Sequence, residues 1–572
     1  MLNLKIMKYM KTLYKIFLVL SVISFSSCGD KLTETNVNPL GVDPETVNPN
    51  LILTTVITNS INPYQRENYY GGVAGVMQYL QKSGWSSSLN KFDWVGNHSW
   101  GGYYGNLRNI NQLAERAEAE GMEFQLGIAH VLHAFNFAMI ADKWGDAPYT
   151  DALKGTEVDN PEYQKPKFDP QEDIYHGIIE ELKKANQLLS KSVGEYNGID
   201  PNADVLYKGD PTKWRKLANS LLLRYYLRLA AKDPNFAKEG IQEIANDQSM
   251  YPVFESNDDN AAMDYVGTTD GDSWPANIVF DASESDFNRT QLCAGLRDVL
   301  YEHNDPRLST WFNKVKVQIK VGNYYPDADI VVDGIRYLNA DTMDAKGLVV
   351  YDKDTWVQAI KDDKVLVDTM EYVGMPVGAS VGEGYTYNLN PSPAQGQANV
   401  HVSALADMFK QATGEYLKAK LMTYAEVCFI LAEAAHMNMT VPKSAGEWYN
   451  AGVEASFDQW GVDGYTEYIA NNGYDGTLGS IMTQKWIANW TVAHEAWADW
   501  RRTGLPEFTW GPTVRRDNMP LRLEYDANEI GRNTDNYEDA ISKLEQTKYT
   551  GTDGNDSSWS KFWLLQGTHK PY

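Results

Sequence analysis

Apolar residues recur at three- and four-residue spacing over several long stretches of the chain, which is the pattern of helices with one buried face. The pattern predicts helices at residues 104–120, 124–143, 171–190, 212–231, 421–437, 444–460, 478–491 and 493–502. Gly121 separates the first two, and Asp210-Pro211 is a start signal for the fourth. The helices come in pairs at loose spacing, which resembles tetratricopeptide repeats without a strict repeat period.

The pattern changes between about residues 250 and 400. Clusters of Gly, Asp, Asn and Pro alternate there with short β-prone runs, such as VKVQIKV at 315–321 and IVVDGIRYL at 330–338. We interpret this region as a loop-rich insertion carried on a helical scaffold. Loops of that size inside a compact protein are usually functional.

The N-terminus predicts export and a lipid anchor. Four lysines precede an apolar run at 16–25, and two small residues, Ser26 and Ser27, precede Cys28. This describes a lipoprotein signal peptide at 1–27, after which Cys28 becomes the lipidated first residue. Ordinary cleavage with an incidental Cys28 is the alternative. Residues 28–50 comprise the lipidated Cys28 and a polar stretch with several prolines, which we interpret as a tether. We interpret residues 51–572 as a single domain. No later apolar run approaches the length of a membrane span, so we expect an anchored chain that does not cross the membrane.

Composition narrows the class of partner. Lys and Arg number 51 and Asp and Glu 76, which gives a formal net charge of −25. Such an excess of carboxylates repels phosphate backbones, so nucleic acid is not expected as a partner. Hydrophobic residues make up 43% of the chain and aromatic residues 12%, which predicts a folded globular protein with a large core.

The predicted helix at 421–437 is apolar on all sides and carries Glu426 and Glu433 seven residues apart on one face. Two carboxylates that lie two helical turns apart on one face could be the acid and base of a glycosidase. Buried carboxylates are more commonly paired, and arginines are available on other predicted helices: Arg224, Arg228, Arg501 and Arg502. We favour structural pairing and expect no enzymatic activity, with a secreted glycoside hydrolase as the alternative.

Metal and cofactor signals are weak. Asp327, Asp329 and Asp333 supply oxygen ligands at near spacing, which suits Ca²⁺, but the central Gly and terminal Glu of an EF-hand loop are lacking. An acidic surface loop is the favoured interpretation, and no cofactor is expected. Cys293 and Cys428 are distant from each other and form no CxxC pair, so we expect buried core thiols.

Several stretches in order along the chain resemble the SusD/RagB family of Bacteroidetes outer-membrane nutrient-binding lipoproteins, closest to the subgroup called SusD-like 2. Up to residue 378 these are KWGDAPYTDAL at 143–153, FDPQE at 168–172, YKGDPTKWRKLANSLLLRYYLRLA at 207–230, NDPRL at 304–308 and YVGMPVG at 372–378. Beyond that residue they are LMTYAEVCFILAEAA, EWYNAGVEASFDQWGV, EAWADWRRTGLPEF, MPLRLEYDANE and WSKFWLL.

The resemblance implies a mainly α fold, in which tetratricopeptide-like helix pairs form a scaffold packed against an irregular loop-rich half with a few short strands. It implies a surface-exposed lipoprotein of the outer membrane that binds an oligosaccharide or, in some members, a peptide. It also implies a partner, a SusC-like TonB-dependent transporter over which the lipoprotein sits as a lid. These are scaffold motifs, so they do not identify the ligand.

Ligand residues must be chosen by chemistry, because sugars present apolar C–H faces and hydroxyl edges to aromatic rings and polar side chains. A Gly-, Ser- and Asn-rich stretch between Tyr64 and Tyr104 holds many rings and reads as a loop. Our foremost candidates are Trp94 and Trp100 beside Asp93 and Asn97, together with Trp85, Tyr69, Tyr70 and Tyr103. Packing of these rings into the scaffold is the alternative.

A second candidate stretch, at residues 270–291, belongs to the loop-rich region. Asn288 could hydrogen-bond a sugar, and Arg289 could pair with a ligand carboxylate, which would fit a peptide or an acidic sugar. A salt bridge within the protein is the alternative for Arg289. Tyr324 and Tyr325 lie in the same region.

Overall fold

The structure is a computed structural model that describes residues 46–84, 87–96, 98–157, 159–326, 329–379 and 384–568; of Tyr70 and Ser87 it describes the backbone alone. The predicted signal peptide, Cys28 and most of the tether lie outside the described residues. From Pro49 onward the chain forms one compact unit.

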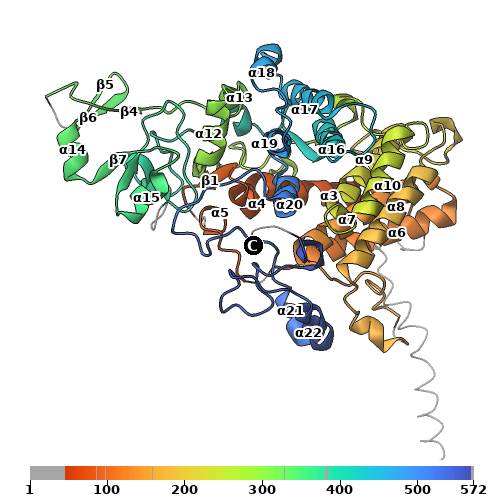
Figure 1. The fold of residues 1–572 in the computed structure, drawn as a ribbon. Coiled ribbons are helices and arrows are strands. Elements are labelled where there is room, and N and C mark those ends of the chain that lie inside the picture. The colour runs from red at the N-terminus through yellow and green to blue at the C-terminus, as the bar shows by residue number, and fades with distance from the viewer. Residues whose placement is uncertain are drawn as a thin grey trace, which may run out of the picture. The chain divides into compact units, whose positions relative to one another are not determined.

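A stack of antiparallel helices forms one half of this unit (Figure 1). In chain order its long helices are α3 (Pro49–Tyr70), α6 (Gly101–Glu120), α7 (Glu123–Trp144), α8 (Gln171–Leu188), α9 (Pro211–Leu229) and α10 (Pro234–Asn246). From α6 onward each packs on the next. Gly121 ends α6 with a left-handed backbone, and the Asp210 carboxylate caps α9 by accepting from the Thr212 amide at 2.9 Å. The predicted mainly α fold with tetratricopeptide-like helix pairs is confirmed.

Helices near the C-terminus continue the stack: α16 (Tyr424–His436), α17 (Ala445–Gln459), α18 (Tyr465–Asn471), α19 (Leu478–Ala488) and α20 (Ala493–Thr503). The predicted helix at 421–437 begins three residues late. Leu421 and Met422 instead belong to β9 (Lys418–Met422), which pairs antiparallel with β2 (Ala261–Asp264). Thr423 then caps α16, because its hydroxyl accepts from the Glu426 amide at 3.3 Å.

The loop-rich half has small sheets. One contains β4 (Gln318–Val321), β6 (Ile335–Leu338) and β5 (Asp329–Val332) in that spatial order, with β4 parallel and β5 antiparallel to β6. Another pairs β7 (Leu348–Val350) with β8 (Val365–Val367). The helices here are short: α12 (Ala294–Glu302), α13 (Arg307–Trp311), α14 (Ala340–Ala345) and α15 (Trp356–Lys361). The two predicted β-prone runs form β4, β5 and β6.

A third two-stranded sheet joins distant parts of the sequence. Strand β1 (Leu80–Lys82) pairs antiparallel with β3 (Thr290–Leu292), with Gln81 opposite Gln291. Short helices flank it: α4 (Gly72–Val76) and α5 (Ser87–Asn90) beside β1, and α11 (Ser285–Arg289) directly before β3. The last α-helices of the chain are α21 (Ala527–Arg532) and α22 (Thr534–Ser542). The loop-rich half is thereby tied to residues that follow the first helix.

Helix α7 contradicts the expectation that no run after the signal peptide approaches the length of a membrane span. Over its 22 residues it is long and apolar enough to cross a membrane. However, 83% of its most apolar window is buried inside the structure, packed between α6 and α8. Its apolar character is therefore explained by its place in the core.

Candidate ligand-binding site

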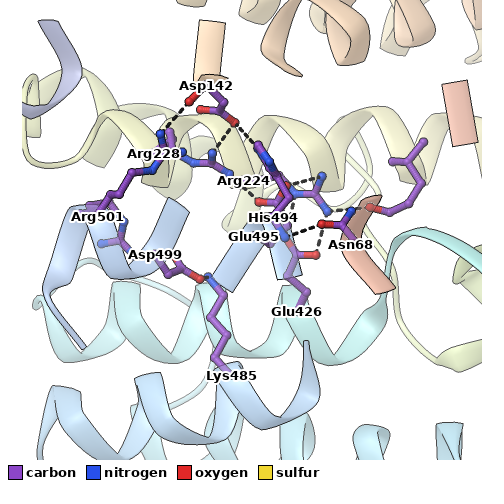
Figure 2. Close-up of polar contacts among 12 residues, drawn as sticks. Asn68, Asp142, Arg224, Arg228, Glu426, Lys485, His494, Glu495, Asp499 and Arg501 are labelled. Carbon is purple, nitrogen blue, oxygen red and sulfur yellow. Dashed lines mark hydrogen bonds and ion pairs between the residues drawn. The ribbon is translucent and has the colours of Figure 1, made fainter. Parts of the chain in front are cut away.

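A buried network of ion pairs joins α7, α9, α16 and α20 (Figure 2). Arg224 contacts both carboxylate oxygens of Glu426 at 2.7 Å, and Arg228 bonds Glu495 and Asp142. Burial raises the pKa of Glu426 in spite of Arg224. Burial would also raise the pKa of Asp142, but Arg228 and His494 hold it well below its usual range. These side chains are at most 4% exposed, so the network is structural.

Glu433 is likewise buried and pairs with Arg502, whose other nitrogen donates to Asp499 at 2.9 Å. A glycosidase needs its two carboxylates on either side of an accessible scissile bond. Glu426 and Glu433 are each 1% exposed and engaged by arginines. Their burial and pairing argue against the glycosidase alternative built on these residues, and the pairing that we favoured is confirmed.

Trp94 and Trp100 do not form the exposed platform that we expected. Each is 4% exposed. The Trp94 ring packs edge-on against Trp497 at 5.2 Å, and Trp100 packs against Phe168 at 5.4 Å and Tyr525 at 5.7 Å. Of the stretch that we expected to be a loop, residues 91–96 and 98–100 are one; most of its other described residues form the end of α3, α4, β1, α5 and the start of α6. Trp94 and Trp100 turn inward because rings from distant parts of the chain cover them, including Trp497 and Tyr525 more than 400 positions away.

The neighbouring candidates have other environments. Tyr69 is not on a loop: it lies in α3, is 1% exposed and packs on Trp274 with ring centres 4.5 Å apart. Tyr103 is half-buried and accepts from the Lys143 ammonium at 2.6 Å. Asp93 forms an ion pair with Arg515 at 3.2 Å. Trp85, Asn97 and the Tyr70 side chain lie outside what the structure describes.

Arg289 is also buried, at 6% exposure, and its guanidinium bonds Asp286 and Ser285 one turn earlier in α11. The expectation that it presents a charge to a ligand carboxylate is therefore not met, and a salt bridge within the protein accounts for it. Asn288, beside it, is half-buried and bonds the Gly396 carbonyl only at 3.4 Å.

The structure brings the two candidate stretches together. The β1–β3 pairing continues as the Ser83 amide donates to the Arg289 carbonyl at 2.9 Å. The Tyr385 amide in turn donates to the Ser83 carbonyl at 2.8 Å. A Cβ on Gly84 would lie 2.9 Å from the Gln395 side chain, so the loop at 384–399 packs closely against the first stretch. Trp85 follows Gly84 directly in sequence.

A cavity of about 90 Å³ opens on the side of α11 and β3 that carries Asn288. Four amide side chains line it, and we call it the amide pocket. Its members are the amides Asn288, Gln291, Asn313 and Asn399, the cations Lys314, Lys316 and Lys410, the carboxylates Glu284 and Asp407, and Phe287, Ala398, Val402 and Ala404. Side-chain amides both donate and accept hydrogen bonds, which suits hydroxyl groups.

Gln291 is the most informative residue of the amide pocket. It lies in the middle of β3, pairs through its backbone with Gln81 on one side and Ala404 on the other, and is 3% exposed. Its side-chain oxygen has no hydrogen-bond partner among the described residues. A buried acceptor left without a donor costs about 1–3 kcal/mol. A ligand that enters the pocket with a donor group would recover this cost.

Two other polar members, Asn399 and Lys410, are held in place by contacts within the protein. Asn399 donates to the Tyr387 carbonyl at 2.8 Å and accepts from the His401 amide at 3.0 Å. Lys410 lies 2.9 Å from Asp407 and 5.3 Å from the centre of the Phe287 ring. Their positions are therefore set before a ligand arrives, which lowers the entropic cost of binding.

A second cavity of about 200 Å³ lies between α12 and the segment at 506–509; we call it the aromatic pocket. Tyr351 and Trp356 stack beside it at 26° and 6.4 Å, and Trp486 and Phe508 also line it. The Tyr351 hydroxyl donates to Asp298 at 2.7 Å, and burial raises the pKa of that carboxyl. Only two residues separate Gln291 of one pocket from Ala294 of the other.

The calcium alternative gains no support. Asp327 lies outside the described residues, and the Asp329 carboxylate is bound by Arg336 through two bonds of 2.8 Å. Within the described ranges no group of three or more His, Cys, Asp or Glu side chains could hold a metal ion. Cys293 and Cys428 are buried free thiols, as expected.

Of the residues that line the amide pocket, the sequence predicted Asn288 as a ligand residue but not Gln291, Asn399 or the lysines. Gln291 belongs to a short buried strand, TQL, and a polar side chain in the middle of that strand is its only local signal. Asn399 and Lys410 reach the pocket through the fold, more than 100 residues later in the chain. No spacing within the sequence predicts that meeting.

Comparison with known proteins places these features in context. A family model named SusD-like 2 and described as starch-binding associating with outer membrane matches residues 42–341 and 362–526. A solved SusD homologue from Bacteroides fragilis aligns with a TM-score of 0.64 and 22% identity over 91% of this chain and 99% of its own. A chitin-binding SusD homologue from Flavobacterium johnsoniae aligns with a TM-score of 0.66 and 19% identity over 90% and 99%. At these identities the structures establish the fold. A search of curated protein sequences found no match.

Proposed function

The chain belongs to the SusD-like 2 family, and from this premise we propose that it is a non-catalytic binding protein of the cell surface, which captures an oligosaccharide in the amide pocket. It then delivers this ligand to a SusC-like TonB-dependent transporter, for which it acts as the lid. The family description associates its members with starch and with the outer membrane.

The unpartnered side-chain oxygen of Gln291 is the observation that carries the assignment of the pocket. Sugar hydroxyls are donors as well as acceptors, so one hydroxyl can satisfy this oxygen while another contacts Asn288. Phe287 and Val402 supply apolar contacts for the C–H groups of a ring. The pocket thus combines both kinds of contact that a sugar requires.

A peptide ligand is the second candidate for the same role. Peptide amides also donate hydrogen bonds, and three lysines around the pocket would suit a terminal carboxylate. Two of these lysines are already paired, Lys314 with Glu371 at 2.7 Å and Lys410 with Asp407 at 2.9 Å. This pairing favours an uncharged ligand, and the chitin-binding relative supports a sugar.

The proposal includes anchoring by a lipid on Cys28. It is supported by the basic, apolar and small-residue order of positions 1–27 and by the family's association with the outer membrane. The excess of carboxylates also argues against docking on anionic lipopolysaccharide by charge, which leaves the lipid as the attachment.

The class of ligand is tested with protein that lacks residues 1–28, titrated calorimetrically with starch and chitin oligosaccharides and with mixed short peptides. We expect saturable binding of one oligosaccharide class and no new reducing ends after prolonged incubation. If the protein binds only peptides, the proposed role remains but its ligand is a peptide. Release of reducing ends by the purified protein would contradict a binding-only role.

A further inference from the structure

The two faces of the β4–β6–β5 sheet differ in how they are covered. Ile319 and Leu338 point to one face and pack with Met343, Leu348 and Val367 in a small core. The strand register places the side chains between them on the opposite face. That opposite face belongs to none of the apolar clusters of the described chain.

The uncovered face carries apolar and aromatic side chains. Ile335 and Tyr337 come from β6, Ile330 lies opposite Tyr337 on β5, and Lys320 lies beside Tyr337 on β4. All four are half-exposed. An antiparallel pair with one packed face normally places polar residues on the other. An apolar open face of this kind marks a site of interaction.

Two further rings extend this face. Tyr324 and Tyr325 follow β4 and are 60% and 38% exposed. Their ring centres lie 5.2 and 4.8 Å from that of Tyr337, inclined at 58° and 63°. We call Tyr324, Tyr325, Tyr337, Ile330, Ile335 and Lys320 the tyrosine face; its sheet lies at one edge of the compact unit (Figure 1, upper left).

We propose that the tyrosine face is a second carbohydrate-binding surface, which holds a polysaccharide chain outside the amide pocket. The inference rests on the proposed function, because the occupant is a longer form of the same ligand. Tyrosine rings offer C–H-binding faces together with hydroxyls. None of these three hydroxyls bonds another described residue, so they remain available to a sugar.

Size and charge favour a sugar over a protein partner. The exposed parts of Tyr324 and Tyr325, the two most exposed rings of the face, add up to roughly one full ring, about 200 Å², and its other four side chains are only partly exposed. A stable protein interface buries about 800 Å² on each partner, which is more than this face offers. Lys320 is the charged side chain of this face, in a chain of net charge −25. Because the only charge that we place on this face is positive, it can bind a neutral or an acidic polysaccharide in spite of the acidic chain.

The test compares a polymer with a short oligomer. Protein lacking residues 1–28 is run in gels that contain soluble starch or glycol chitin, and titrated with oligosaccharides of the same sugar. We expect Tyr324→Ala/Tyr325→Ala to weaken retention by the polymer about tenfold and to leave oligomer binding unchanged. Tyr301→Ala, which removes a 49% exposed tyrosine from α12, is the matched control and should change neither.

Each other outcome overturns the inference in a distinguishable way. Oligomer binding by the unmodified protein together with unchanged polymer retention of the double variant removes the second surface but keeps the proposed function. Failure of the unmodified protein to bind any polymer or oligomer removes both. Unchanged polymer retention with altered self-association of the double variant would make this face a protein interface. If the double variant fails to fold, Lys320→Gln and Tyr324→Phe take its place in the same assays.

Discussion

Arg224 and Glu426 form a two-point ion pair between α9 and α16, with both nitrogen-to-oxygen distances at 2.7 Å and both side chains 2% exposed. Removing one partner of such a pair leaves the other charge buried, which costs about 3–5 kcal/mol. We therefore expect Glu426→Gln to lower the melting temperature strongly, measured by calorimetry or circular dichroism.

The matched control for this pair is Glu415→Gln, which changes an exposed glutamate and should melt like the unmodified protein. A Glu426→Gln variant of unchanged melting temperature would contradict the structural role of the pair. If it also lost a hydrolytic activity, the carboxylate would have to be regarded as catalytic.

Trp100 is expected to behave as a core residue. Its ring contacts Trp144, Phe168 and Tyr525, and it is 4% exposed. Replacement by Ala leaves a cavity and should reduce the free energy of unfolding by about 3–5 kcal/mol. Urea denaturation followed by tryptophan fluorescence measures this loss. A stable Trp100→Ala variant with weakened sugar binding would instead restore the platform that the sequence suggested.

Lys420 should make the stability of the folded protein depend on pH, and the direction of its pKa shift fixes the sign. Burial lowers the pKa of this lysine from 10.5 to about 7, and its ammonium lies 3.9 Å from the centre of the Trp460 ring. Because the unfolded chain binds this proton more tightly, unfolding takes up a proton between about pH 7 and 10.5. The contribution of Lys420 to stability therefore becomes more favourable as the pH rises through this window.

We expect Lys420→Met to be more stable than the unmodified protein at pH 7 by an amount on the order of 4 kcal/mol, and the difference to shrink toward pH 10.5. Thermal denaturation of both proteins across this range tests it. A difference that stays constant with pH would show that Lys420 does not change its protonation in that window.

Most of the helical scaffold could be predicted from sequence, because apolar spacing and caps such as Asp210 and Gly121 act locally. Errors arose where a distant partner decided the outcome. Leu421 is apolar in either a helix or a strand, and its pairing with β2 settles the choice. Trp94 lies in a glycine- and serine-rich loop, but Trp497 covers it.

The amide pocket, our proposed ligand site, shows the same limit more strongly. Asn288 was predicted because polar residues cluster locally around it. Gln291 was missed because its significance depends on burial and on an unpartnered oxygen, neither of which can be read from the letters TQL. Arg289 was misjudged for the opposite reason, since its partner Asp286 lies one helical turn away and satisfies it.

Anchoring is tested at Cys28. Lipidation requires the thiol, so Cys28→Ser should move the protein from the membrane fraction to the soluble fraction of cells. Immunoblotting of the two fractions measures this distribution. Cys293→Ser, which changes a buried thiol of the core, is the control and should not alter fractionation. Membrane fractionation that survives Cys28→Ser would contradict the lipid anchor.

The central claim is that the amide pocket binds the sugar through the buried oxygen of Gln291. Calorimetric titration of one oligosaccharide into the unmodified protein, Gln291→Leu and Gln81→Leu measures this directly, since Gln81 is also a buried glutamine, lies opposite Gln291 and does not line the pocket. Loss of one buried hydrogen bond costs about 1–3 kcal/mol, so we predict a Kd for Gln291→Leu that is about 5- to 100-fold higher, with Gln81→Leu unchanged. Equal affinity of Gln291→Leu and the unmodified protein would contradict the assignment of this pocket.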